Sequence, residues 1–358
     1  MSKSVYVTAP VYNIEKRKLK QMVKSFVKQS YDNWKLLIVD DGSKKETANY
    51  LDYLATFDDR ITVIHQENAG CVEARRTGFR AMEGADYIAT VDSDDYIPKY
   101  ALEIMINTAE EYEADLVVGG AKKVIGNLEI PYKPNAFFKT ERVYSHTEII
   151  RELLISYFGW GIMPVSVWGK LYDKKFLPIL SEGEIVNVFT ATDANASLNV
   201  IPHVQRLAVV SKPVYCYRTG GGTSKFRSDY MEETLNWYRY RLPFIEKYLS
   251  DFSTSGITAY DLMAEELKNE TRFHLKRYIT SKCPSDEDIV KMIDSFFEVP
   301  EITEAFCNHT VHKGYIEYNE YMKEKNSAEV LKVLKAEVYD EKKKNRYRNL
   351  IKTILEKV

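Results

Sequence analysis

The first 120 residues alternate strand-like and helix-like patterns, and this alternation constrains the fold more than any other feature. Short apolar runs rich in β-branched residues are separated by segments whose apolar residues recur at i, i+3, i+4 and i+7. The expected strands are Val5–Thr8, Lys35–Val39, Ile61–Ile64, Tyr87–Val91 and Asp115–Gly119. Such alternation predicts an α/β, mostly parallel, doubly wound sheet with helices on both faces.

Three of the expected strands end in polar clusters. These clusters are Pro10-Val11-Tyr12-Asn13, Asp40-Asp41-Gly42-Ser43 and Asp92-Ser93-Asp94-Asp95. The proline of the first cluster lacks an N–H, so its strand is expected to stop at Thr8. Because the carboxyl ends of parallel strands share one edge, where ligands of such sheets bind, the clusters predict a site there.

The third cluster carries three carboxylates directly after an apolar run. Alternation along an extended chain would place Asp92 and Asp94 on one side, with Ser93 and Asp95 facing away. Two carboxylates suit Mg²⁺ or Mn²⁺, whose coordination is usually completed by substrate phosphates. The alternative is a polar turn in which an aspartate caps the next helix.

Composition excludes several classes of protein. The 50 basic and 52 acidic residues give a net charge of -2, so no nucleic-acid partner is expected. Neither Gly-x-Gly-x-x-Gly nor a Walker loop occurs, which disfavours dinucleotide and ATP sites. The four cysteines are far apart and are expected to be free thiols. With no targeting or transmembrane segment recognised, a cytoplasmic protein is expected.

The second part of the chain has a different pattern. Residues 126–227 are less regular, and Gly126–Lys139, with its prolines, is expected to be a loop. Residues 228–358 are expected to form an all-helical domain. The basic run Lys342–Arg348 is interpreted as a solvated helix face, with contact to acidic lipid or a partner as the alternative.

The polar clusters, together with Asn68-x-Gly70-x3-Ala74-Arg75-x2-Gly78, resemble in order and spacing the family 2 glycosyltransferases with the GT-A fold. The resemblance covers the first 125 residues and extends less tightly to about residue 225. It implies a GT-A domain over residues 1–227, a nucleotide-sugar donor, commonly a UDP-sugar, and Mn²⁺ or Mg²⁺. It also implies that the anomeric carbon is inverted.

The resemblance also assigns site residues. It implies donor contacts for Pro10, Val11, Tyr12, Asn13, Asp41, Arg75, Asp92 and Ser93, and metal ligation by Asp94 with Asp92. The segment Trp168-Gly169-Lys170 would adjoin the sugar pocket, and Arg218, Thr223, Ser224 and Lys225 would hold the diphosphate. The alternatives are a surface Arg75 paired with Glu73 or Glu83, a buried Trp168, a solvated Lys170 and a flexible glycine-rich linker around residues 220–222.

An inverting transfer needs a general base for the acceptor hydroxyl. The family usually carries Glu-Asp at the position of Thr192-Asp193, which makes Asp193 the expected base and Glu184 the second candidate. The alternative is that Asp193 only caps the helix that follows.

The expected function is hexosyl transfer from a UDP-sugar to a glycan or glycoprotein, as in bacterial surface polysaccharide synthesis or adhesin glycosylation. The helical domain is expected to bind the acceptor or to form a homo-oligomer, and peripheral membrane contact stays open. Two alternatives are an inactive GT-A scaffold and a sugar nucleotidyltransferase, whose glycine-rich, basic N-terminal motif is missing here.

Overall fold

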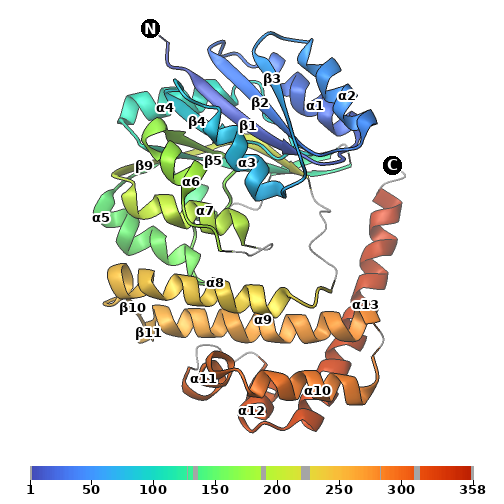
Figure 1. Ribbon diagram of the computed structural model, residues 1–358. Helices are drawn as coiled ribbons and strands as arrows, with labels where there is room; N and C mark the ends of the chain where they lie inside the picture. Colours follow the sequence, from blue (N-terminus) through green and yellow to red (C-terminus); the bar gives the residue numbers. More distant parts are fainter. Residues whose placement is uncertain are drawn as a thin grey trace. The chain divides into compact units, whose positions relative to one another are not determined.

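The computed structural model in Figure 1 describes residues 2–126, 128–131, 136–186, 191–218, 226–282, 284–309 and 315–355. The chain forms two compact units. The first comprises Met1–Tyr157, Gly161–Ile185 and Ala191–Gly221, and the second comprises Phe158–Trp160, Val186–Thr190 and Gly222–Val358. Thr223, Ser224 and Lys225 lie outside the described residues, so their assignment and the domain boundary at residue 227 stay predictions.

The first unit is built on one mixed sheet with the order β3-β2-β1-β4-β8-β5-β9-β7, and β6 pairs with β5. Its strands are β1 (Val5–Val11), β2 (Trp34–Asp41), β3 (Ile61–Gln66), β4 (Tyr87–Thr90), β5 (Leu116–Ile125), β6 (Leu128–Pro131), β7 (Val143–Ser145), β8 (Lys170–Asp173) and β9 (Arg206–Arg218). β1 to β5 and β9 run in one direction, whereas β6, β7 and β8 run opposite to them. The mostly parallel sheet expected from the sequence is confirmed.

Helices cover both faces of this sheet (Figure 1). They are α1 (Lys16–Val27), α2 (Lys45–Ala55), α3 (Cys71–Arg80), α4 (Ala101–Tyr112), α5 (His146–Glu148), α6 (Leu177–Glu182) and α7 (Thr192–Val200), with a π-helical stretch at Ile149–Leu153 and a 3₁₀ turn at Leu154–Tyr157 after α5. The apolar faces of α1 and α4 pack in one core with the odd-numbered residues of β1. α3 packs on the opposite face, where a Cβ on Gly78 would lie 1.8 Å from Thr8 Oγ1. Only glycine therefore allows this close approach of helix to strand.

The structure corrects two expected boundaries. β1 does not stop at Thr8 but continues through Pro10, which pairs with Val39 of β2. The Thr8 carbonyl faces β4, where it accepts from the N–H of Val91, and Pro10 faces the same way two residues later. Since β4 has ended at Thr90, no ladder bond is lost at the proline.

The second correction concerns the expected loop over residues 126–139. Its first part is strand β6, which pairs antiparallel with the end of β5 from Ile125↔Leu128 to Lys122↔Pro131. Gly126 has a φ of +60°, a conformation that glycine adopts without strain in a tight connection.

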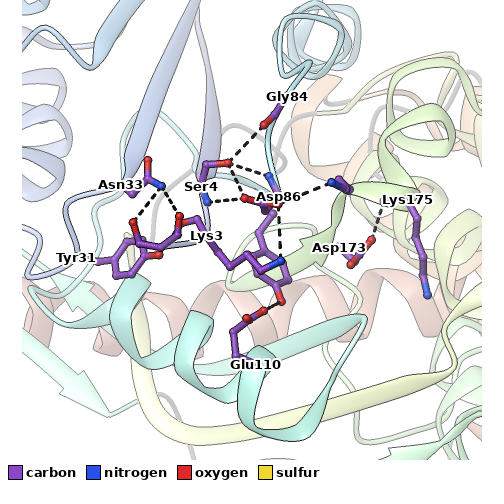
Figure 2. A network of polar contacts seen from close by, with 12 residues as sticks. Lys3, Ser4, Tyr31, Asn33, Gly84, Asp86, Glu110, Asp173 and Lys175 are labelled. Carbon is purple, nitrogen blue, oxygen red and sulfur yellow. Dashed lines mark hydrogen bonds and ion pairs between the residues drawn. The ribbon is translucent and has the colours of Figure 1, made fainter.

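The amino-terminal ends of β1 and β4 are joined by a polar network, shown in Figure 2. The backbone N–H of Ser4 donates to Asp86 Oδ2 over 2.9 Å, and the N–H of Asp86 donates to Ser4 Oγ over 3.0 Å. Lys3 Nζ lies 3.9 Å from Asp86 Oδ1, and the Tyr87 hydroxyl donates to Glu110. This edge, opposite to the predicted site, is therefore held by reciprocal hydrogen bonds.

The second unit is mainly helical, as expected. It contains α8 (Tyr230–Phe244) with a π-helical extension (Ile245–Leu249), the two-stranded pair β10 (Ser253–Thr254) and β11 (Ile257–Thr258), and helices α9 (Ala259–Lys282), α10 (Asp286–Phe297), α11 (Pro300–Asn308), α12 (Ile316–Lys323) and α13 (Ser327–Leu355). Ser285 caps α10 in a capping box with Asp288. The basic run lies within α13, and its described side chains, Lys342 to Lys344, are exposed. Over the part of the chain described here, no helix has the length and apolarity needed to cross a membrane.

Candidate active site

The acidic cluster lies at the carboxyl end of β4. β4 ends at Thr90, and residues 92–95 form a turn in which the Asp95 N–H donates to the Asp92 carbonyl over 3.0 Å. The segment is therefore a turn rather than an extended chain. Side-chain exposure nevertheless alternates, since Ser93 and Asp95 are buried whereas Asp92 and Asp94 are half-exposed. The expected common orientation of Asp92 and Asp94 was derived for an extended chain and stays a prediction.

Arg75 of α3 connects two acidic positions that are distant in sequence. Its guanidinium is buried, with NH1 3.2 Å from Asp193 Oδ1 and NH2 3.5 Å from Asp92 Oδ1. It is not the surface arginine of the alternative interpretation, because Glu73 pairs with Arg80 instead. One buried cation thus joins the turn after β4 to the start of α7.

Burial and neighbouring charges shift the pKa values of both Arg75 and Asp92. Burial disfavours the cation, but Asp193 and Asp92 together raise the pKa of Arg75 above its ordinary value. Burial and the neighbouring Asp193 raise the pKa of Asp92 to about 6, against the opposing effect of Arg75. Two carboxylates share one cation, and Asp94 adds a third negative charge nearby. The site therefore has an excess of negative charge that favours binding of a further cation.

Asp193, the expected base, lies in the first turn of α7. The N-cap of this helix is Ala191, and no side-chain cap hydrogen bond is formed there, so the structure does not support the capping alternative. Asp193 Oδ2 accepts from the Val167 N–H over 3.4 Å. The positive end of the helix macrodipole stabilises its charge. Glu184, the second candidate, is exposed, and its carbonyl accepts from Asn199 Nδ2 over 2.8 Å.

Trp168 and Lys170 serve internal contacts in this structure. Trp168 is half-buried, and its ring stacks on Tyr215 with centroids 4.5 Å apart. Lys170 is 1% exposed, which differs from both the expected donor contact and the solvated alternative. Its ammonium donates to the Pro164 carbonyl over 2.8 Å and lies 3.4 Å from Ser197 Oγ of α7, while burial lowers its pKa to about 7. Lys170 therefore fastens the segment before β8 to the helix that carries Asp193.

Asp41 organises the loop before α3. Its carboxylate accepts hydrogen bonds from Gln66 Nε2 and the Ala69 N–H, both over 2.8 Å, and from the Gly70 N–H over 2.9 Å. The structure thus gives Asp41 a role in placing the start of the Arg75 helix. Its expected contact with a nucleobase stays a prediction.

The end of β1 presents one open aromatic ring. Pro10 and Val11 are buried, whereas Tyr12 is 54% exposed. Asn13 has a φ of +53° and accepts on Oδ1 from the Lys44 N–H over 2.9 Å, which ties β1 to the turn after β2. Of these four residues, Tyr12 is therefore the one whose ring is accessible for stacking on a nucleobase.

Two residues around the acidic turn were not expected in the roles that they have. The buried Tyr215 hydroxyl accepts from the Asp92 N–H over 3.0 Å. Arg218 donates from NH1 to the Asp94 carbonyl and from NH2 to Gln21, while its own N–H donates to Asp95 Oδ1 over 2.7 Å. Its expected contact with a diphosphate stays a prediction. The signal in the sequence is weak, because both residues reach the turn through the pairing of β9 with β5.

The residues at the turn fit a hard divalent cation. Asp94 is half-exposed, and its carboxylate makes no hydrogen bond or ion pair with the described residues. No group of three or more His, Cys, Asp or Glu ligands is found within the described ranges. Mg²⁺ and Mn²⁺ are commonly held by one or two carboxylates with phosphate oxygens completing the shell, which is the donor set that Asp94 and Asp92 can supply.

Known proteins carry the same domain. Residues 6–176 match the family described as Glycosyl transferase family 2. The chain is 29% identical over 224 residues to glycosyltransferase GlyA of Streptococcus pneumoniae, covering 61% of this chain and 31% of that protein. It is 36% identical over 120 residues to GlyG of the same organism, covering 33% and 39%, and 26% identical over 217 residues to the uncharacterised glycosyltransferase EpsJ of Bacillus subtilis, covering 60% of each. The matches thus span from 31% to 60% of the length of these relatives.

Solved structures share the fold. Residues 1–349 of Staphylococcus aureus TarS, in complex with UDP-GlcNAc, superpose with a TM-score of 0.65 at 19% identity, over 93% of this chain and 91% of that one. The same TarS segment in complex with UDP gives a TM-score of 0.63 at 16% identity, over 93% and 90%. The expected GT-A architecture is confirmed, and the chain carries a glycosyl transferase family 2 domain.

Proposed function

We propose that this chain transfers a sugar from a UDP-sugar to a hydroxyl group of a glycan or glycoprotein, with inversion and with the help of a divalent cation. The observation that carries the proposal is the Asp92–Arg75–Asp193 cluster at the carboxyl edge of the sheet, where ligands of such folds bind. The family 2 domain supports the reaction class, and the UDP and UDP-GlcNAc complexes of TarS support the donor class.

The chemical roles follow from the positions of the side chains. Asp193 takes the proton of the acceptor hydroxyl as that oxygen attacks the anomeric carbon. Arg75 orients this carboxylate and separates it from Asp92. Tyr12 offers an exposed ring on which the nucleobase of the donor stacks. A cation held by Asp94 and Asp92 would stabilise the charge that develops on the departing diphosphate.

The test is release of UDP from a panel of UDP-sugars, with Mn²⁺ and with EDTA. Wild-type protein is expected to release UDP from one sugar, with water as a slow acceptor, and EDTA is expected to stop it. Asp94→Ala should lower the release by roughly 10²-fold or more, because the ligand for the cation is lost. Asp59→Ala, a change at an exposed aspartate after α2, is the matched control and should leave release unchanged.

Three results would contradict the proposal. The assigned metal site would be wrong if UDP bound with Mn²⁺ but Asp94→Ala released UDP at the wild-type rate, with or without metal. Absence of UDP binding altogether would favour the inactive scaffold. Consumption of a nucleoside triphosphate and a sugar phosphate would instead indicate a nucleotidyltransferase.

A further inference from the structure

Helix α1 carries a basic groove that the proposed reaction does not use. A cavity of about 460 Å³ lies between α1 and the segment after the acidic turn. Its exposed cations are Arg17, Lys20, Lys24, Lys28 and Lys99, and its half-buried floor includes Gln21, Ser25 and Tyr96. No acidic residue lines it, and within the described part of the chain none of these five cations forms an ion pair. We call this cavity the α1 groove.

The charges in the first turn of α1 and the spacing of its lysines oppose the rules that stabilise isolated helices. The first turn has no acidic residue, although the helix macrodipole favours negative charge there, and it begins with Lys16, Arg17 and Lys18. Lys20, Lys24 and Lys28 then follow at i, i+4 spacing, where like charges repel, although the macrodipole favours Lys24 in the last turn. Local arrangements that oppose stability are typical of functional surfaces. Because the whole chain has a net charge of -2, this excess is local.

The groove leads away from the candidate active site. α1 follows β1, so its first turn lies at the carboxyl edge of the sheet and its last turn near the opposite edge. Gln21 in the groove accepts a hydrogen bond from Arg218, which also donates to the Asp94 carbonyl. The Arg218 guanidinium lies over the ring of Tyr96, 5.1 Å from its centroid. One arginine thus forms part of the connection between the groove and the acidic turn.

The groove and the Arg75 cluster lie on opposite faces of the sheet. α1 packs with the odd-numbered residues of β1, whereas Gly78 of α3 packs on Thr8. A donor held by the residues assigned above is therefore separate from a ligand in the groove. Successive lysines at i, i+4 are about 6 Å apart along the helix axis. This spacing fits a chain whose anionic groups recur at a similar interval.

We propose that the α1 groove binds the acceptor, and that the acceptor is a chain with regularly spaced phosphate or other anionic groups. This inference rests on the proposed glycosyl transfer and names the class of acceptor for it. The chain lies along α1, and its reacting hydroxyl extends over the sheet edge towards Asp193. The concave shape of the groove favours a single chain over the flat surface of an anionic membrane.

The test uses the full chain and two double variants that change the net charge equally. Lys24→Glu/Lys28→Glu alters the groove far from the acidic turn, and Lys139→Glu/Lys212→Glu alters exposed lysines elsewhere in the same unit. The probe is linear polyphosphate, with inorganic phosphate at equal phosphate concentration as a comparison. Wild type and control should bind polyphosphate in a salt-dependent manner, and the groove variant should bind it about tenfold or more weakly.

A separate measurement keeps this inference distinct from the proposed function. UDP release without an acceptor should be equal in wild type and both variants. If none of the three proteins released UDP, that result would contradict the proposed glycosyl transfer but not the binding of a chain in the α1 groove. The acceptor inference is overturned if polyphosphate does not bind, if both variants bind it equally, or if inorganic phosphate competes as well as the chain. Binding to phosphatidylglycerol vesicles without binding to polyphosphate would overturn it in favour of a membrane contact.

Discussion

The two ends of the same parallel strands hold aspartates in opposite states. At the amino end, hydrogen bonds from Ser4 lower the pKa of Asp86, although burial opposes them. At the carboxyl end, burial and the adjacent Asp193 raise the pKa of Asp92 to about 6. The Nε of Arg75 is also buried there without a hydrogen-bond partner among the described residues. At the amino edge the polar groups are satisfied by hydrogen bonds. At the carboxyl edge the pKa of a carboxyl group is raised and a buried donor lacks a partner among the described residues, as is common at functional sites.

The largest expected effect is a loss of activity on changing Asp193 at the carboxyl edge. Asp193→Asn should lower UDP release by roughly 10³-fold, because the amide cannot accept the proton of the attacking hydroxyl. Donor binding should stay close to that of wild type, since Asp193 is not assigned to the nucleotide. Steady-state kinetics and calorimetric titration with UDP would measure both. Loss of UDP binding in this variant would instead indicate a structural role.

The second prediction concerns the cation between the carboxylates. Arg75→Met should lower the free energy of unfolding by about 3 kcal/mol, because two carboxylates lose their buried partner. Arg80→Met on the same helix is the control. Its pairs with Glu73 and Glu182 are exposed, so the change should cost about 1 kcal/mol or less. Equal losses in urea unfolding would show that the Arg75 cluster is an ordinary surface contact.

The third prediction uses the buried lysine beneath α7. The pKa of Lys170 is lowered by burial to about 7 from 10.5, so between these values the unfolded chain binds more protons than the folded one. Stability should therefore rise with pH over this window, by up to about 1.4 kcal/mol per pH unit from this group. Lys170→Met should remove that rise in urea unfolding measured from pH 7 to pH 10. An unchanged slope would show that the ammonium is solvated.

The smallest effect is expected at the amino edge. Asp86→Asn should cost about 1 kcal/mol at neutral pH, because it weakens the hydrogen bonds from Ser4, and it should leave UDP release unchanged. The folded-state pKa of Asp86 is lowered, so its contribution is present above the unfolded pKa and is lost as the pH falls through the folded one. A fall in UDP release would mean that the two edges are coupled.

Residue patterns predicted the fold of about the first 120 residues, because each strand and helix there has its own local apolar periodicity. β1 to β4 and the helices between them follow one another along the chain, and both the apolar periodicities and the polar clusters were readable. The grouping of Asp92 with Arg75 and Asp193 was only partly predictable. Their roles came from resemblance, and residue patterns did not predict that one guanidinium contacts both carboxylates.

The sequence by itself determined the strand–helix alternation, the shared edge of the polar clusters and the identity of the acidic turn. Periodicity encodes which face of each element is buried, and parallel strands place their carboxyl ends together. Only the tertiary structure decided that Pro10 stays within β1, that Lys170 is buried and that Tyr215 and Arg218 hold the turn. The position of Pro10 depends on where the neighbouring strand β4 ends. The contacts of Tyr215 and Arg218 depend on the packing of segments that are more than a hundred residues apart. Local residue patterns do not contain that information.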